Sequence, residues 1–93
     1  MIQSFGDKDT ESLFNRERTK KLPSVLFHRA RSKLLIIHAA TNEKDLSIPP
    51  GNRFERLKGD KKGWYSIRIN DLWRVIFKWM EGKACEVTIT DYH

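Results

Sequence analysis

The chain has 93 residues, 39% of them hydrophobic, which is typical of one small domain with a modest core. Its formal net charge of +6 indicates either simple solubility or an anionic partner, nucleic acid first among them. The single cysteine excludes an internal disulfide, and no apolar run or basic start indicates a membrane span or a signal peptide. We therefore expect one domain over residues 1–93 in the cytoplasm, without a membrane partner.

The first half of the chain is predicted to be mainly helical. Residues 1–5 alternate as in a short strand, and Asp7 or Asp9 is in position to cap a short helix over about residues 7–18. A longer helix is predicted over about residues 23–40, opened by a proline and a serine. Its apolar residues recur at helical spacing: Leu26, Ala30, Leu34 and Ile37.

The second half is predicted to form strands. After the chain-breaking Pro-Pro-Gly sequence come four strand-like segments, namely residues 53–57, 64–69, 73–80 and 84–92. The short separators between them predict hairpins, and hence an antiparallel sheet. Helices followed by such a sheet indicate an α+β fold, with the N-terminal helices packed on one face of the sheet.

The loop between the second and third of these segments decides which side chains meet. A two-residue loop places Ile67 opposite Arg74 and buries a charge, whereas a three-residue loop over residues 70–72 places Ile67 opposite Val75. We prefer the three-residue loop, although it lacks the glycine that such turns favour. It makes Arg68 and Arg74 neighbours on the helix-free face, and repulsion between them is tolerated most readily where an anion comes between.

The last strand adds residues to the same face. Val87 and Ile89 are predicted to face the core, which leaves three residues beside the arginines: Thr88, Thr90 and Tyr92. Simple strand alternation predicts that the side chains of Asp91 and His93 point to the opposite face of the sheet. The end of a strand can also twist free, so the sequence leaves their position open.

Such a face suits cleavage of RNA, which carries its own nucleophile in the 2′-hydroxyl group. Basic side chains stabilise the charge of a pentavalent phosphorane, and an imidazole exchanges protons near neutral pH. His93 lies close to Asp91 and bears the terminal carboxylate, and both charges favour the protonated imidazole of a general acid. Tyr92 is able to stack on a splayed base. The simpler alternative is a solvated terminal histidine without a role.

Residues 53–74 also combine charge with aromatic rings. Seven basic and three acidic residues give this stretch a net charge of +4. It also contains Trp64, Tyr65 and Trp73. Single-stranded nucleic acid is bound by this combination, although rings in strands more often belong to the core. No metal and no cofactor are predicted, because the histidines and Cys85 lack metal-ligand spacing and no glycine-rich phosphate loop is present.

Three stretches together resemble the HigB toxins of the RelE/ParE superfamily, which belong to bacterial type II toxin–antitoxin systems and are also called plasmid-maintenance killer proteins. They are MIQSF, NRFERLKGDKKGWYSIRINDLWRVIFKW and ITDYH, and they extend from the first residue to the last. The resemblance implies a RelE-like fold, with helices on one face of a curved antiparallel sheet. It further implies a ribosome-dependent mRNA endoribonuclease, an mRNA interferase that cleaves mRNA in the ribosomal A site, inhibits translation and arrests growth.

The resemblance also implies partners: a HigA-like helix-turn-helix antitoxin, the ribosome and mRNA, with DNA contacted only through the antitoxin. ParE-type relatives instead inhibit DNA gyrase without catalysis, which is the main alternative. A passive RNA-binding module is a third.

Matching the motifs assigns site residues. Lys58 of LKGD and Arg74 of LWRV resemble the phosphate-contacting groups of the family, and the terminal catalytic cluster corresponds to Asp91, Tyr92 and His93. Arg68 and Arg56 are expected to add contacts to the RNA phosphates.

One position departs from the family pattern. Some relatives have a catalytic histidine two or three residues before the lysine of LKGD, whereas this chain has Glu55 in that region. We expect Glu55 to act as an auxiliary base that accepts the 2′-hydroxyl proton. Weak activity is the other interpretation of this departure.

Overall fold

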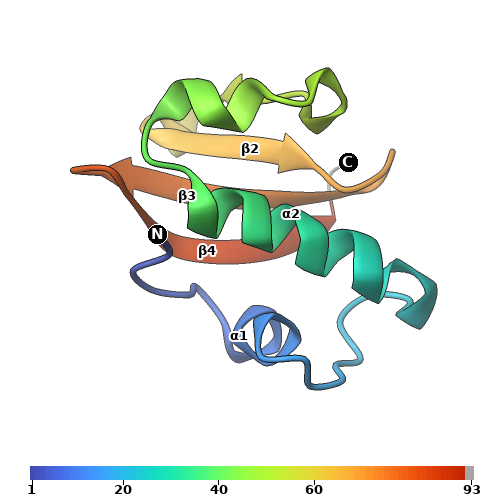
Figure 1. The fold of residues 1–93 in the computed structure, drawn as a ribbon. Coiled ribbons are helices and arrows are strands. Elements are labelled where there is room, and N and C mark those ends of the chain that lie inside the picture. The colour runs from blue at the N-terminus through green and yellow to red at the C-terminus, as the bar shows by residue number, and fades with distance from the viewer. Residues whose placement is uncertain (92–93) are drawn as a thin grey trace.

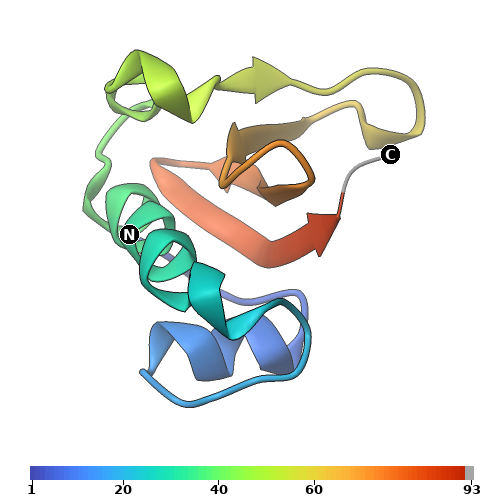
Figure 2. The same ribbon diagram turned by 90° about the vertical axis from the view of Figure 1, so that its right-hand side faces the viewer.

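The computed structural model describes residues 1–91, which form a layer of helices on a layer of strands (Figure 1). The elements are α1 (Lys8–Phe14), α2 (Phe27–Ala39), β1 (Glu55–Arg56), β2 (Trp64–Arg68), β3 (Trp73–Met80), β4 (Lys83–Asp91) and four short 3₁₀ helices, η1 (Ser24–Leu26), η2 (Glu43–Ser47), η3 (Pro50–Asn52) and η4 (Gly59–Lys61). The strands form one antiparallel sheet in the order β1-β2-β3-β4. Both α-helices cover the same face of it (Figure 2), which confirms the predicted α+β fold.

The core lies between that face and the helices. Its fully buried side chains come from both layers and include Leu13, Ala30, Leu34, Ile37, Ile67, Val75, Phe77 and Val87. Their removal from water is the main favourable term in folding. The predicted apolar stripe of α2 is confirmed, except that Leu26 is only half-buried because it belongs to the separate 3₁₀ turn before the helix.

Helix α1 is shorter than the sequence predicts. The Asp7 carboxylate caps it by accepting a hydrogen bond from the Thr10 backbone N–H at 2.9 Å. The helix ends at Phe14 and not near Arg18, because Arg16 adopts the left-handed conformation with φ of 65°. Burial opposes ionisation of Asp7, but its hydrogen bonds from Lys21 and Thr10 together lower the pKa of the carboxyl group.

Two predicted strands are shorter in the structure. Residues 1–5 form only two isolated parallel bridges with β4, at Ile2 and Phe5. The strand predicted over residues 53–57 is reduced to the two residues of β1, since Arg53 has φ of 44°, which ends the extended conformation.

The predicted three-residue loop between β2 and β3 is confirmed. Ile67 lies opposite Val75, and Arg68 lies opposite Arg74. The loop forms without glycine because the Asn70 side chain stabilises it. Its oxygen accepts hydrogen bonds from the backbone N–H groups of residues 72 and 73, at 2.9 and 2.7 Å. The sheet register therefore follows the sequence pattern.

A bulge in β4 was not predicted. Ile76 pairs with Thr88 but Lys78 pairs with Cys85, so β4 carries one extra residue at this point. Glu86 absorbs it with φ of 53°. Val87 and Ile89 beyond the bulge are buried, as predicted.

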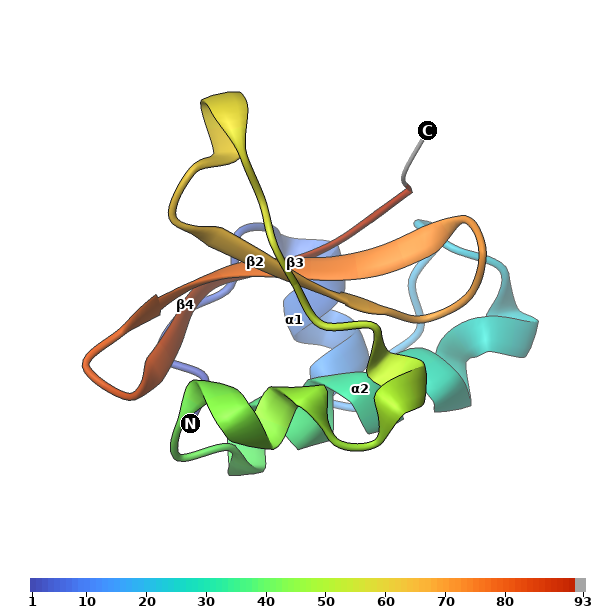
Figure 3. The same ribbon diagram turned by 90° about the horizontal axis from the view of Figure 1, so that it is seen from above.

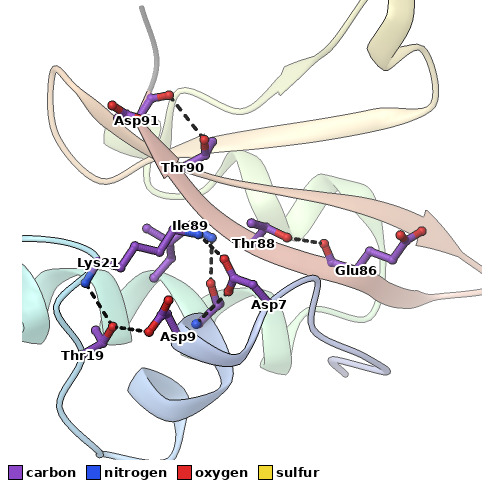
Figure 4. Close-up of polar contacts among 10 residues, drawn as sticks. Asp7, Asp9, Thr19, Lys21, Glu86, Thr88, Ile89, Thr90 and Asp91 are labelled. Carbon is purple, nitrogen blue, oxygen red and sulfur yellow. Dashed lines mark hydrogen bonds and ion pairs between the residues drawn. The ribbon is translucent and has the colours of Figure 1, made fainter.

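The end of β4 is anchored to α1. The hydroxyl of Thr10, which is completely buried, accepts a hydrogen bond from the backbone N–H of Ile89 at 2.9 Å (Figure 4). Ile89 lies two residues before Asp91. This bond therefore fixes the part of the strand that leads to the expected terminal cluster.

Replacing Thr10 by valine should lower the free energy of unfolding by about 1–3 kcal/mol, because the isosteric side chain leaves the buried Ile89 N–H without an acceptor. Urea denaturation at neutral pH measures the effect. Thr90→Val is the matched control, since the Thr90 hydroxyl is near solvent and donates to a neighbouring carbonyl oxygen. An equal loss of stability in both variants would contradict the anchoring role.

Candidate functional site

Arg74 on β3 is the central side chain of the helix-free face. Its Nε donates to the hydroxyl of Ser66, its Nη2 donates to the carbonyl oxygen of Arg53 at 2.7 Å, and Nη2 lies 3.3 Å from a carboxylate oxygen of Glu55. The side chain is only 10% exposed. Because the planar guanidinium matches several acceptors in fixed directions, these contacts hold it in one orientation.

Glu55 stands beside this arginine at the edge of the sheet. β1 places it opposite Ser66 on β2, and its side chain is 53% exposed. The structure thus brings the expected auxiliary base into contact with the expected phosphate-binding arginine. The carboxylate is accessible to a ligand that approaches from solvent.

Arg68 lies directly opposite Arg74, yet the two guanidinium groups do not depend on a bound anion. Arg68 forms an ion pair with Asp71, and Arg74 forms one with Glu55. Each arginine therefore has its own carboxylate, which offsets the repulsion that the register creates. Both carboxylates are at least half exposed, so solvent screens these pairs.

The end of β4 approaches the same cluster. Thr90 lies opposite Arg74, and exposed Asp91 follows it at the end of the strand. The last residues of β4 still pair with β3, and they run toward the side of the sheet away from the helices (Figure 3). Tyr92 and His93, the other members of the expected terminal cluster, lie outside the described residues.

Lys58 is on a loop and not on a strand. It is exposed and directly precedes η4, in the connection from β1 to β2. Gly59 has φ of 66°, a conformation that glycine adopts without strain. The η4 segment also projects from the sheet on the side away from the helices (Figure 3), which is the side of Arg74.

Of the three aromatic residues noted near the basic groups, only Trp64 belongs to the helix-free face. The ammonium groups of Lys61 and Lys78 lie 4.9 and 5.1 Å from the centre of its ring. Tyr65 and Trp73 pack against the core. The general observation that strand aromatics belong to the core therefore holds for two of the three.

Arg56 does not join the cluster. Its guanidinium donates to Glu43 at 2.7 Å, and the hydroxyl of Tyr65 donates to the same carboxylate at 3.0 Å. These two hydrogen bonds lower the pKa of Glu43, and Glu43 in turn raises the pKa of Arg56. Strand alternation turns Arg56 away from neighbouring Glu55, so it lies on the other face of the sheet from Arg74.

Sequence reasoning missed two partners of Arg74. The role of Ser66 could have been detected in the sequence. Ser66 lies two residues before Arg68, so strand alternation places its hydroxyl on the same face as Arg68 and Arg74. The role of the Arg53 carbonyl oxygen could not have been detected, since it depends on the left-handed conformation of that residue. Ser66 is completely buried, and its role is to position the arginine.

Among residues 1–91, no group of three or more His, Cys, Asp or Glu side chains is arranged to hold a metal ion. No helix in the same part of the chain has the length and apolar character needed to cross a membrane.

Comparison with known proteins gives consistent matches over the chain. A family model described as a RelE-like toxin of the type II toxin–antitoxin system HigB matches residues 3–93. Toxin HigB-1 of Vibrio cholerae is 45% identical, over 100% of this chain and 98% of that protein. Endoribonuclease HigB of Proteus vulgaris is 32% identical over the whole of both chains.

A solved structure shows the same fold. The crystal structure of YafQ from E. coli strain BL21(DE3) matches with a TM-score of 0.64 and 12% sequence identity, over 98% of this chain and 91% of that one. The likeness covers the helices and the antiparallel sheet alike. With a family match over nearly every residue and two full-length relatives of the same name, the chain belongs to the HigB family of RelE-like toxins from type II toxin–antitoxin systems.

Proposed function

We propose that this chain is a ribosome-dependent mRNA endoribonuclease, which cuts mRNA in the ribosomal A site and so inhibits translation. The observation that supports this most is the position of Arg74, which is fixed by Ser66 and paired with Glu55 near the end of β4. The full-length relative from Proteus vulgaris is named an endoribonuclease. A fixed arginine with a carboxylate beside it supplies two of the groups that RNA cleavage requires.

The proposed reaction uses the 2′-hydroxyl of the RNA as the nucleophile. Its oxygen bonds to the adjacent phosphorus while the bond from phosphorus to the 5′-oxygen breaks, which leaves a 2′,3′-cyclic phosphate and a 5′-hydroxyl. Glu55 accepts the proton of the 2′-hydroxyl, and His93 donates a proton to the leaving oxygen. Asp91 orients His93 and favours its protonated form, and Tyr92 stacks on a base.

The basic groups act on the phosphate. Arg74, Arg68 and Lys58 donate charge-assisted hydrogen bonds to its oxygens as negative charge develops there. Since Arg74 is already fixed in place, it needs no reorganisation during the reaction, which is the condition for strong electrostatic stabilisation. Arg56 is left out of the proposed site, because its guanidinium binds Glu43 on the opposite face.

The proposed partners follow from the family. A type II toxin has an antitoxin, which we propose is a HigA-like helix-turn-helix protein that also carries the contact with DNA. The isolated toxin should cut free RNA poorly, because the ribosome must hold the 2′-hydroxyl in line with the bond that breaks. The proposed place of action is the cytoplasm, where ribosomes translate.

Changing Glu55 to glutamine should slow cleavage of ribosome-bound mRNA by about 10²–10⁴-fold, the usual contribution of a general base. Single-turnover cleavage on programmed ribosomes measures the rate. Glu17→Gln, on the exposed loop after α1, is the matched control and should keep the parental rate. Parental cleavage by the Glu55→Gln protein would remove Glu55 from the mechanism.

The variant His93→Ala, or a chain extended beyond residue 93, should no longer arrest growth, because the leaving oxygen then lacks its proton donor or the donor is displaced. Thermal unfolding of the purified protein should stay unchanged in His93→Ala. Plating efficiency after induction measures the arrest. Full toxicity of either variant contradicts the assigned role.

Inhibition of DNA gyrase, the main alternative, is less consistent with the match to a HigB family model and to an endoribonuclease. Primer-extension mapping after a short induction separates the alternatives. Transcripts cut within translated codons are the expected result. Cleaved DNA with an SOS response and intact transcripts would point to gyrase, and RNA binding without growth arrest would point to a passive module.

A further inference from the structure

A second basic feature lies beside the proposed catalytic cluster and shares Arg68 with it. A cavity of about 370 Å³ opens between the first half of α2, the η3 turn and the end of β2. In Figure 1 β2 ends over the N-terminal half of α2, which runs in the opposite direction. Four residues of the lining matter here: His28, Arg29, Lys33 and Arg68.

The lining is strongly positive. It includes no aspartate or glutamate from residues 1–91. Within residues 1–91, the one carboxylate bound to a lining group is that of Asp71, which pairs with Arg68 but is 98% exposed and therefore well screened by water. Burial, followed by repulsion from Arg29 and Arg68, lowers the pKa of Lys33. Within residues 1–91 the protein thus gathers these cations with a single, solvent-screened carboxylate beside them.

One of the cations is held in place by the protein interior. The ammonium group of Lys33 donates to the side-chain oxygen of Asn52 at 2.6 Å. Asn52 is completely buried, and its own amide nitrogen donates to the carbonyl oxygens of Leu46 and Ile48, at 3.1 and 3.2 Å. An ammonium group has three donors, and within residues 1–91 Lys33 makes this one hydrogen bond. Two donors therefore remain for a ligand.

Arg68 connects this cavity with the catalytic cluster. It lines the cavity and also lies directly opposite Arg74 in the sheet. β1 pairs with β2 at Ser66 and Tyr65, so no strand within residues 1–91 covers the edge of β2 beside Arg68. A chain of phosphates bound at Arg74 can therefore continue past Arg68 to the cavity.

We propose that this cavity is a second phosphate subsite, which binds a phosphodiester group of the RNA backbone through Arg29, Lys33 and Arg68. The proposal rests on the proposed function and adds a binding site to it. The phosphate belongs either to the mRNA strand held at Arg74 or to ribosomal RNA, and the chemistry of recognition is the same in both. Such contacts set the position of the RNA and carry no information about its sequence.

Reversing the charge of Arg29 tests the proposal. Arg29 is exposed, so Arg29→Glu should fold with the thermal stability of the parent. Lys44→Glu makes the same change of charge in η2, beyond the other end of α2, and is the matched control. For each protein, the dissociation constant is measured against salt concentration with vacant ribosomes and with ribosomes that carry mRNA. All variants also carry His93→Ala, which prevents cleavage during the measurement.

Arg29→Glu should weaken binding and reduce the slope of log K against log salt by about one relative to Lys44→Glu, because one phosphate contact is lost. The same loss with vacant and programmed ribosomes supports the site with ribosomal RNA as the ligand. A loss confined to programmed ribosomes, and equal for different codons, supports mRNA. If the salt dependence of binding is unchanged with both vacant and programmed ribosomes, the proposal is overturned. A loss of affinity for the antitoxin alone would also overturn it.

These readouts are independent of catalysis. A parent protein that fails to cut mRNA would contradict the proposed function, but it would leave the salt dependence of ribosome binding to be judged by itself. The two hypotheses can therefore fail separately.

Discussion

The hydrogen-bonded register between β2 and β3 determines which side chains share each face of the sheet. Ile67 opposite Val75 places hydrocarbon under the helices, and the same spacing places Arg68 opposite Arg74 on the other face. A shift of one residue would exchange the two faces and bury charge in the core. The apolar core therefore enforces the cross-strand pairing of two arginines, and the remainder of the site is arranged around that consequence.

Two carboxylates reduce the resulting repulsion without removing the positive character of the face. Glu55 and Asp71 are exposed partners, so their pairs with the arginines are weakened by solvent. An RNA strand presents a series of phosphodiester groups, and together these are able to compete with the two screened carboxylates for the arginines. In the free toxin this surface is therefore open and charged. RNA phosphates are able to replace the exposed carboxylates, while Ser66 and the carbonyl oxygen of Arg53 keep Arg74 in place.

The helices contribute to the site from the other side of the sheet. The buried hydroxyl of Thr10 binds the backbone of β4 close to its end, and the first residues of the chain bridge to the start of the same strand. Helix α2 supplies Arg29 and Lys33 to the basic cavity at the edge of β2. Elements that form the core thus also direct polar groups toward the region where we propose that RNA binds.

The sequence by itself determined the element types, the three-residue loop, the facing of Ile67 and Val75, and the placement of Arg68 beside Arg74. It could do so because helix and strand periods are local, and because burying a charge excludes the alternative register. It misplaced the ends of α1 and β1 and did not predict the bulge in β4, since these depend on single residues that adopt positive φ.

The tertiary structure decided which groups actually meet. Alternation along β1 gives Glu55 and Arg56 opposite directions, but only the folded sheet shows that Glu55 contacts Arg74 and that Arg56 contacts Glu43. The buried Asn52 that holds Lys33 is nineteen positions away in sequence. Contacts of this kind depend on the distance between elements and on the paths of loops, and neither quantity is encoded in a local pattern of residues.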